Sequence, residues 1–104
     1  MSITNFFEET TKEFTGTITL NDATPDITSD TVTLYMYKKG SDDTIEKTAD
    51  VSLGSGQYKI ALDTTDTDVS PGNWDYEIWW VKDTGESYVL ETGKVIIYDS
   101  QAKT

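Results

Sequence analysis

Residues 62–78 read LDTTDTDVSPGNWDYEI, and this stretch decides the fold class. An apolar strand ends at Leu62, and an acidic, threonine-rich connection with one apolar residue, Val69, follows it. Pro71 and Gly72 then give a turn signal directly before the most hydrophobic strand of the chain. The segment therefore predicts a strand, a crossing over the end of a β-sandwich, and a return strand in the opposite sheet.

The return strand, WDYEIWWVK (74–82), alternates with a period of two. Successive side chains of a strand point to opposite faces, so this alternation predicts one buried face and one outward face. The inward set is Trp74, Tyr76, Ile78 and Trp80, and the outward set is Asp75, Glu77, Trp79 and Val81. We expect either Trp74 or Tyr76 to close the corner at Pro71-Gly72 through its polar tip.

The same alternation recurs in FTGTITL (14–20), TVTLYMYKK (31–39) and QYKIALD (57–63). A weaker strand is expected at 44–51, where the register slips once, and the final run ESYVLETGKVIIYD (86–99) is long for one strand. Phe14, Ile18 and Leu20 are expected to face inward in the first of these runs. Gly93 suggests a bulge or kink in the last run. Turn signals at regular spacing then predict an all-β chain, a single antiparallel immunoglobulin-like β-sandwich of about seven strands. We expect this domain at 13–99, an N-terminal extension at 1–12 and a C-terminal tail at 100–104.

The composition excludes several kinds of chemistry. The 104 residues include 19 acidic side chains and 8 lysines, with no arginine, histidine or cysteine, for a net charge of −11. Ser-His-Asp catalysis, Cys/His zinc sites and disulfides are therefore excluded. Scattered lysines on an acidic chain disfavour nucleic acids and anionic membranes as partners. No stretch reads as an export signal, so we expect synthesis in the cytoplasm without a signal peptide.

The order of these motifs resembles the small immunoglobulin-like modules of tailed-phage structural proteins, including the N-terminal domains of baseplate upper proteins. The resemblance covers roughly residues 13 to 98 and rests on FTGTITL, DTVTLYMYKKGSDDT, QYKIALD, DTTDTDVSPGNWDYEIWW and GESYVLETGKVIIYD. It implies a non-catalytic phage or prophage protein of the tail, baseplate, neck or decoration class. It further implies a place in the virion and contacts with other virion proteins or with a second copy.

Outward aromatic residues are the candidate interaction surface. Strict alternation sends Trp79 and Val81 outward, and a hairpin partner in register would add Val89, Ile96 and Tyr98. Tyr35 and Tyr37 are a second outward pair, on another strand. Exposed Trp and Tyr are typical of interfaces. The alternative is that the N-terminal segment covers this face with Phe6 and Phe7, or that the alternation breaks near Trp80.

A carbohydrate-binding module is the alternative function, with Trp79, Tyr35 and Tyr37 stacking on sugar rings. Asp63, Asp66 and Asp68 offer oxygen ligands for an assisting calcium ion, although their spacing is not that of an EF-hand. Loop acids of this kind more commonly accept backbone hydrogen bonds. No other cofactor is expected. Glu77 and Glu91 are expected to be neighbours on an outer face, but without the cleft that a glycosidase needs.

Overall fold

The computed structural model describes residues 3–99, and within them every regular element is a β-strand. The strands are β1 (Phe6–Phe7), β2 (Lys12–Thr17), β3 (Thr31–Tyr37), β4 (Thr44–Thr48), β5 (Gln57–Leu62), β6 (Gly72–Val81) and β7 (Ser87–Tyr98). The prediction of an all-β chain is confirmed. The described part contains no helix of the length and hydropathy needed to cross a membrane.

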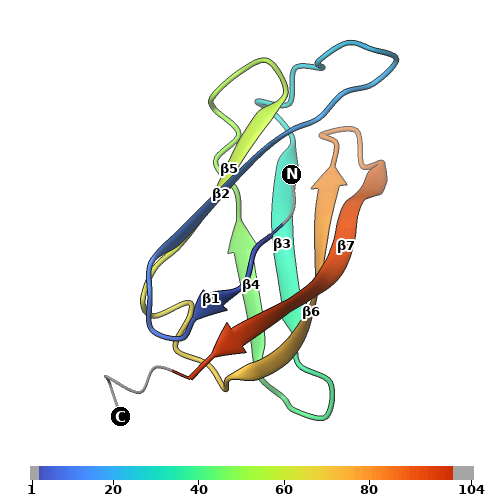
Figure 1. Cartoon of the computed structure of the whole chain (residues 1–104). Coiled ribbons are helices and arrows are strands. Elements are labelled where there is room, and N and C mark those ends of the chain that lie inside the picture. Colours follow the sequence, from blue (N-terminus) through green and yellow to red (C-terminus); the bar gives the residue numbers. More distant parts are fainter. Residues whose placement is uncertain (1–2, 100–104) are drawn as a thin grey trace.

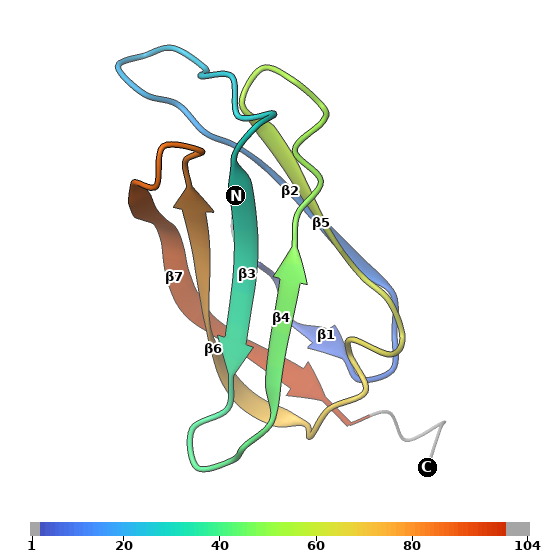
Figure 2. The same cartoon turned by 180° about the vertical axis from the view of Figure 1, so that it is seen from behind.

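The strands form two sheets, which Figures 1 and 2 show from opposite sides. The larger sheet has five strands in the order β1-β7-β6-β3-β4, and the smaller one pairs β2 with β5. Every pairing is antiparallel except that of β1 with β7, which is parallel. The expectation of a purely antiparallel structure is therefore wrong at this edge. The reason is that the chain places Phe6 and Phe7 beside Ile97 and Tyr98 before it crosses to the smaller sheet.

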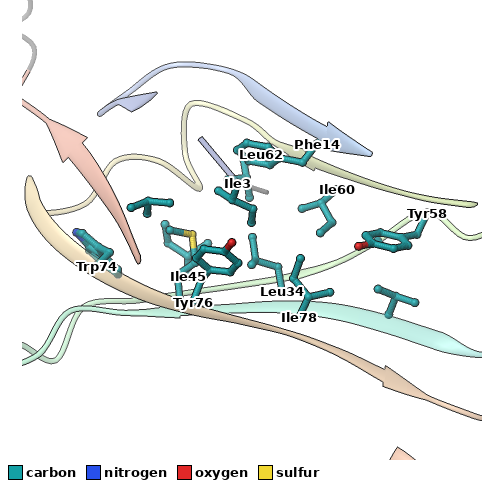
Figure 3. Packing of buried hydrophobic residues seen from close by; sticks show 14 of the residues in the cluster. Ile3, Phe14, Leu34, Ile45, Tyr58, Ile60, Leu62, Trp74, Tyr76 and Ile78 are labelled. Atoms are coloured by element: carbon teal, nitrogen blue, oxygen red, sulfur yellow. The ribbon is translucent and has the colours of Figure 1, made fainter. Parts of the chain in front are cut away.

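The hydrophobic core lies between the inner faces of the two sheets. Figure 3 shows Phe14, Ile60 and Leu62 of the smaller sheet opposite Leu34 and Ile78 of the larger one. Trp74 lies toward one end of this core and Tyr58 toward the other. The inward set predicted for β6 is buried throughout, with exposed fractions of 4% or less: Trp74, Tyr76, Ile78 and Trp80.

The N-terminal segment contributes to the core. Ile3 and Phe6 are buried, and the Phe6 ring packs against Phe14 with 6.4 Å between ring centroids. The side chain of Asn5 accepts a hydrogen bond from the backbone N–H of Ile96 at 2.9 Å. Part of the expected extension at 1–12 is thus paired and packed, whereas the expected tail at 100–104 lies outside the described residues.

Leu20 departs from its expected inward position and is 51% exposed. β2 ends at Thr17, and Leu20 instead exchanges two backbone hydrogen bonds with Ala23 across a tight turn. Asn21 and Asp22 have positive φ in that turn, a conformation that short polar side chains tolerate. The alternating pattern therefore continues in the sequence beyond the point where the backbone leaves the sheet.

Candidate functional site

Three aromatic side chains meet on the outer face of the larger sheet. Tyr35 and Tyr37 of β3 and Trp79 of β6 line a shallow depression of about 440 Å³ together with Glu77. Tyr35 lies directly opposite Glu77, and Trp79 lies opposite Thr33. Trp79 is thus the diagonal cross-strand neighbour of Tyr35. Two side chains of this size can contact one another across that diagonal. The sequence assigned these aromatics to separate strands, and the register brings them together.

The indole of Trp79 is held in place on this face. Its Nε1 donates a hydrogen bond to Oε1 of Glu77 at 2.9 Å. Trp79 is half-buried, and its cross-strand partner Thr33 is only 8% exposed although the alternation places it on the outer side. Tyr35 and Tyr37 remain 38% and 42% exposed. Side chains that are ordered before binding lose little entropy on contact, which suits a binding surface.

Two valines extend the surface toward β7. Val89 lies opposite Trp79 in the β6–β7 ladder and is 46% exposed, and Val81 is 37% exposed. We call Tyr35, Tyr37, Trp79, Val81 and Val89 the outer aromatic surface. It crosses β3, β6 and β7, the three strands that are paired on both sides in this sheet.

Ile96 and Tyr98 do not belong to this surface, and the expectation that they lie beside Trp79 is wrong. Ile96 is opposite Asn73, six positions before Trp79 and so about 20 Å away along β6. Tyr98 instead packs against Phe7 of β1, with 5.2 Å between ring centroids. The N-terminal segment therefore covers the far end of β7 and leaves the outer aromatic surface open.

The acidic connection before β6 is held by its own hydrogen bonds. Oδ1 of Asp63 accepts from the backbone N–H groups of Thr65 and Asp66, both at 2.9 Å. Oδ2 of Asp66 accepts from the N–H of Asp63 at 2.9 Å and from Lys47 Nζ at 3.0 Å. Burial opposes ionisation of Asp66, but these donors outweigh it and lower its pKa. Asp68 is exposed, and within residues 3–99 no three acidic side chains gather as a metal site requires.

Trp74 closes the corner that follows this connection. Its Nε1 donates to the carbonyl oxygen of Ser70 at 2.9 Å, and the Ser70 hydroxyl in turn donates to the carboxylate of Asp43. This hydroxyl is the main cause of the lowered pKa of Asp43. Lys38 Nζ donates to the carbonyl oxygen of Pro71 at 2.8 Å, and Gly72 follows with a φ of 134°. Of the two expected corner residues, Trp74 takes this role.

The second expected corner residue, Tyr76, binds a carboxylate on the inner face instead. Its hydroxyl donates to Oε2 of Glu91 at 2.6 Å. Desolvation, followed by this hydrogen bond, raises the pKa of Tyr76 to about 12. Burial and the charge of Glu91 also raise the pKa of Tyr58. Glu91 thus lies near two phenols, in the seam between the two sheets, and the alternation of the sequence does not predict this cluster.

A bulge in β7 explains why Glu91 faces inward. The register shifts between Ile78 and Trp79, so that Glu91 lies opposite Ile78 and Val89 lies opposite Trp79, with Leu90 as the extra residue. The expected neighbour pair of Glu77 and Glu91 is therefore wrong, because the bulge puts the two carboxylates on opposite faces.

The expected irregularity at Gly93 is also misplaced. Gly93 pairs regularly with Tyr76, and a Cβ atom there would lie 2.7 Å from the Tyr76 ring. Gly16 has the same relation to Tyr58 on the smaller sheet, at 2.4 Å. Each of these glycines lies opposite a tyrosine whose ring fills the space that a side chain would need. This pairing is the sequence signal that could have indicated the cluster of Tyr58, Tyr76 and Glu91.

Comparisons with known proteins add a likeness of fold. No protein-family model matches the chain, and no curated protein matches its sequence significantly. A crystal structure of a proposed glycoside hydrolase from Bacteroides vulgatus ATCC 8482 is similar in shape, with a TM-score of 0.58 and 10% sequence identity. The match covers 94% of this chain but only 17% of that one. At this identity the likeness concerns the β-rich fold alone.

Proposed function

We propose that this chain is a non-catalytic protein-binding module, an immunoglobulin-like β-sandwich that assembles into a tailed-phage or prophage particle. The observation that carries the proposal is the outer aromatic surface, in which Tyr35, Tyr37 and Trp79 lie side by side on the central strands. Such residues are enriched at the energetic centres of protein interfaces. The partner is another virion protein or a second copy of this chain.

The strand order supports the immunoglobulin-like part of the proposal. In such sandwiches the second and fifth strands share one sheet, while the third, sixth and seventh share the other. Here β2 pairs with β5, and β3, β6 and β7 are neighbours, with β4 added at the edge as in variable-type domains. The resemblance of the sequence motifs to phage modules supports the virion role.

A carbohydrate-binding module remains the second candidate because of one specific feature. Glu77 lies within the depression formed by Tyr35, Tyr37 and Trp79, so a hydrogen-bond acceptor stands beside aromatic side chains. Sugars bind to such combinations by stacking on the rings and donating hydroxyl hydrogen bonds to the acceptor.

Two measurements separate these candidates. Size-exclusion chromatography with light scattering is expected to show an oligomer that Trp79→Ala weakens and that Tyr88→Ala, an exposed aromatic outside the surface, leaves unchanged. The protein-binding role is contradicted if the chain is strictly monomeric and if Trp79→Ala also leaves particle assembly unaltered. A glycan array with and without calcium is expected to give no sugar-dependent signal; a signal lost in Trp79→Ala supports the carbohydrate candidate instead.

A further inference from the structure

Among the described residues, 3–99, no strand pairs with one edge of β2 in the smaller sheet. The backbone N–H of Ile18 donates to the carbonyl of Gly56 at 2.8 Å, in register with the β2–β5 ladder. In an antiparallel pair, hydrogen-bonded positions alternate with positions whose backbone groups point away. The N–H and C=O groups of Glu13, Thr15 and Thr17 therefore face the open side. Within residues 3–99 no backbone hydrogen bond uses them.

Most of this edge lacks the features that usually protect a free strand, because its charged residues, Lys12 and Glu13, are confined to the first two positions of β2. Natural edge strands carry lysines or prolines, contain bulges, or are covered. Residues 14–20, FTGTITL, contain no charged residue and no proline, and Thr15, Thr17 and Thr19 are exposed. In constant-type immunoglobulin sandwiches the first strand lies in the same sheet as the second. Here β1 pairs with β7 instead, so no strand from the described part of the chain lies in the place beside β2.

A polar pocket lies beside this edge, in the seam between the sheets. It has a volume of about 270 Å³ and is lined by Gly16, Thr17, Ile18, Thr19, Tyr58, Leu90 and Glu91. Tyr76 holds Oε2 of Glu91, which leaves Oε1 as an acceptor. The ion pairs found within residues 3–99 are Lys47–Asp66 and Lys94–Asp75, so none of the described lysines neutralises Glu91.

We infer that the free edge of β2 binds an extended segment of a partner protein, and that a lysine of this segment enters the seam to pair with Glu91. The backbone groups of Thr15 and Thr17 supply the main-chain hydrogen bonds of strand addition. A single free carboxylate oxygen suits the compact ammonium of lysine better than the two-pronged guanidinium of arginine.

Charge identifies the occupant as a basic segment rather than a second copy of β2. The chain carries a net charge of −11, so it attracts a basic partner. A second copy carries the same net charge and is repelled, although its β2 includes one lysine, Lys12. The inference is independent of the outer aromatic surface, which lies on the outward side of the other sheet.

The test uses the full chain labelled with ¹⁵N and two matched peptides, acetyl-TVTKTVT-amide and the same peptide with norleucine in place of lysine. Alternation places the lysine and both valines of the first peptide on one face. The lysine peptide is expected to shift the amide signals of Thr15 and Thr17 and to bind at least about tenfold more tightly than the norleucine peptide. Glu91→Gln is expected to remove this preference while leaving the fold intact.

Variants of the edge complete the test. Thr15→Pro removes an outward N–H without removing a hydrogen bond to β5, so it is expected to weaken the binding of both peptides. Thr15→Val keeps that N–H and is expected to bind both peptides as the wild type does. Trp79→Ala is expected to bind normally as well, which separates this inference from the proposed function. If Thr15→Pro fails to fold, the comparison of Glu91→Gln with wild type decides alone. Any one of three results overturns the inference: no binding at about 1 mM peptide, equal binding of both peptides, or a homodimer formed through β2.

Discussion

The indole nitrogen of Trp80 donates a 2.8 Å hydrogen bond to Oδ2 of Asp30, so that residues 50 positions apart in the chain are joined at one end of the fold. Oδ1 of the same carboxylate accepts from the backbone N–H of Asp83 at 3.0 Å. One side chain before β3 therefore fixes both the end of β6 and the turn into β7.

Asp30→Ala is expected to lower the free energy of unfolding by about 1–3 kcal/mol, because it removes two hydrogen bonds and leaves a buried indole N–H without its acceptor. Urea denaturation followed by tryptophan fluorescence measures this loss. Asp42→Ala, which removes an exposed loop carboxylate, is the matched control and is expected to change stability by less than about 0.5 kcal/mol. Equal effects of the two variants contradict the role given to Asp30.

Stability is expected to fall as the pH rises above 10 because of Tyr76. Its folded pKa is raised from 10.0 to about 12, chiefly by desolvation. The folded state therefore favours the protonated phenol, and the stability that this contributes is complete below pH 10 and is lost as the pH rises toward 12. Urea midpoints across this range measure the loss. Tyr76→Phe is expected to flatten the dependence, and an equally steep fall in this variant assigns the effect to other groups.

Gly93→Ala is expected to destabilise the fold by about 1–3 kcal/mol, because the added methyl group meets the Tyr76 ring, which is fixed by Glu91. Thr92→Ala, at the exposed neighbouring position, is the control for a general effect of alanine in β7. Thermal unfolding of both variants compares them directly. A Gly93→Ala protein as stable as wild type shows that the tyrosine ring moves aside freely.

Calcium is expected to leave the melting temperature unchanged, because Asp63 and Asp66 already accept hydrogen bonds from backbone N–H groups and from Lys47. Calorimetry in millimolar calcium and in chelator, at equal ionic strength, measures the difference. A calcium-dependent rise that disappears in Asp63→Asn identifies a binding site in this connection and favours the carbohydrate candidate.

The sequence predicts the faces of the strands well where the backbone stays regular. Tyr76 and Ile78 are buried because strict alternation over β6 coincides with an unbroken ladder to β3. Glu91 could not be assigned to its face, because one extra residue at Leu90 reverses the alternation and no residue type there demands a bulge.

Tertiary pairing accounts for the other departures. β1 has only two residues and no local signal, and its pairing with Ile97 and Tyr98 holds it in the sheet. Tyr98 lies nine positions beyond Val89, the partner of Trp79, so the separation of Tyr98 from Trp79 follows from the length of β7 once that pairing is known. The meeting of Tyr35 with Trp79 depends on the β3–β6 register.

The most direct measurement of the central claim is sedimentation velocity over a dilution series of three proteins. These are wild type, the double variant Tyr35→Ser/Trp79→Ser in the outer aromatic surface, and Phe7→Ser/Tyr98→Ser in the other exposed aromatic pair. The account predicts concentration-dependent association of the wild type and of the Phe7/Tyr98 variant, and its loss in the Tyr35/Trp79 variant. Association that survives unchanged in the Tyr35/Trp79 variant but is lost in the Phe7/Tyr98 variant would contradict the claim.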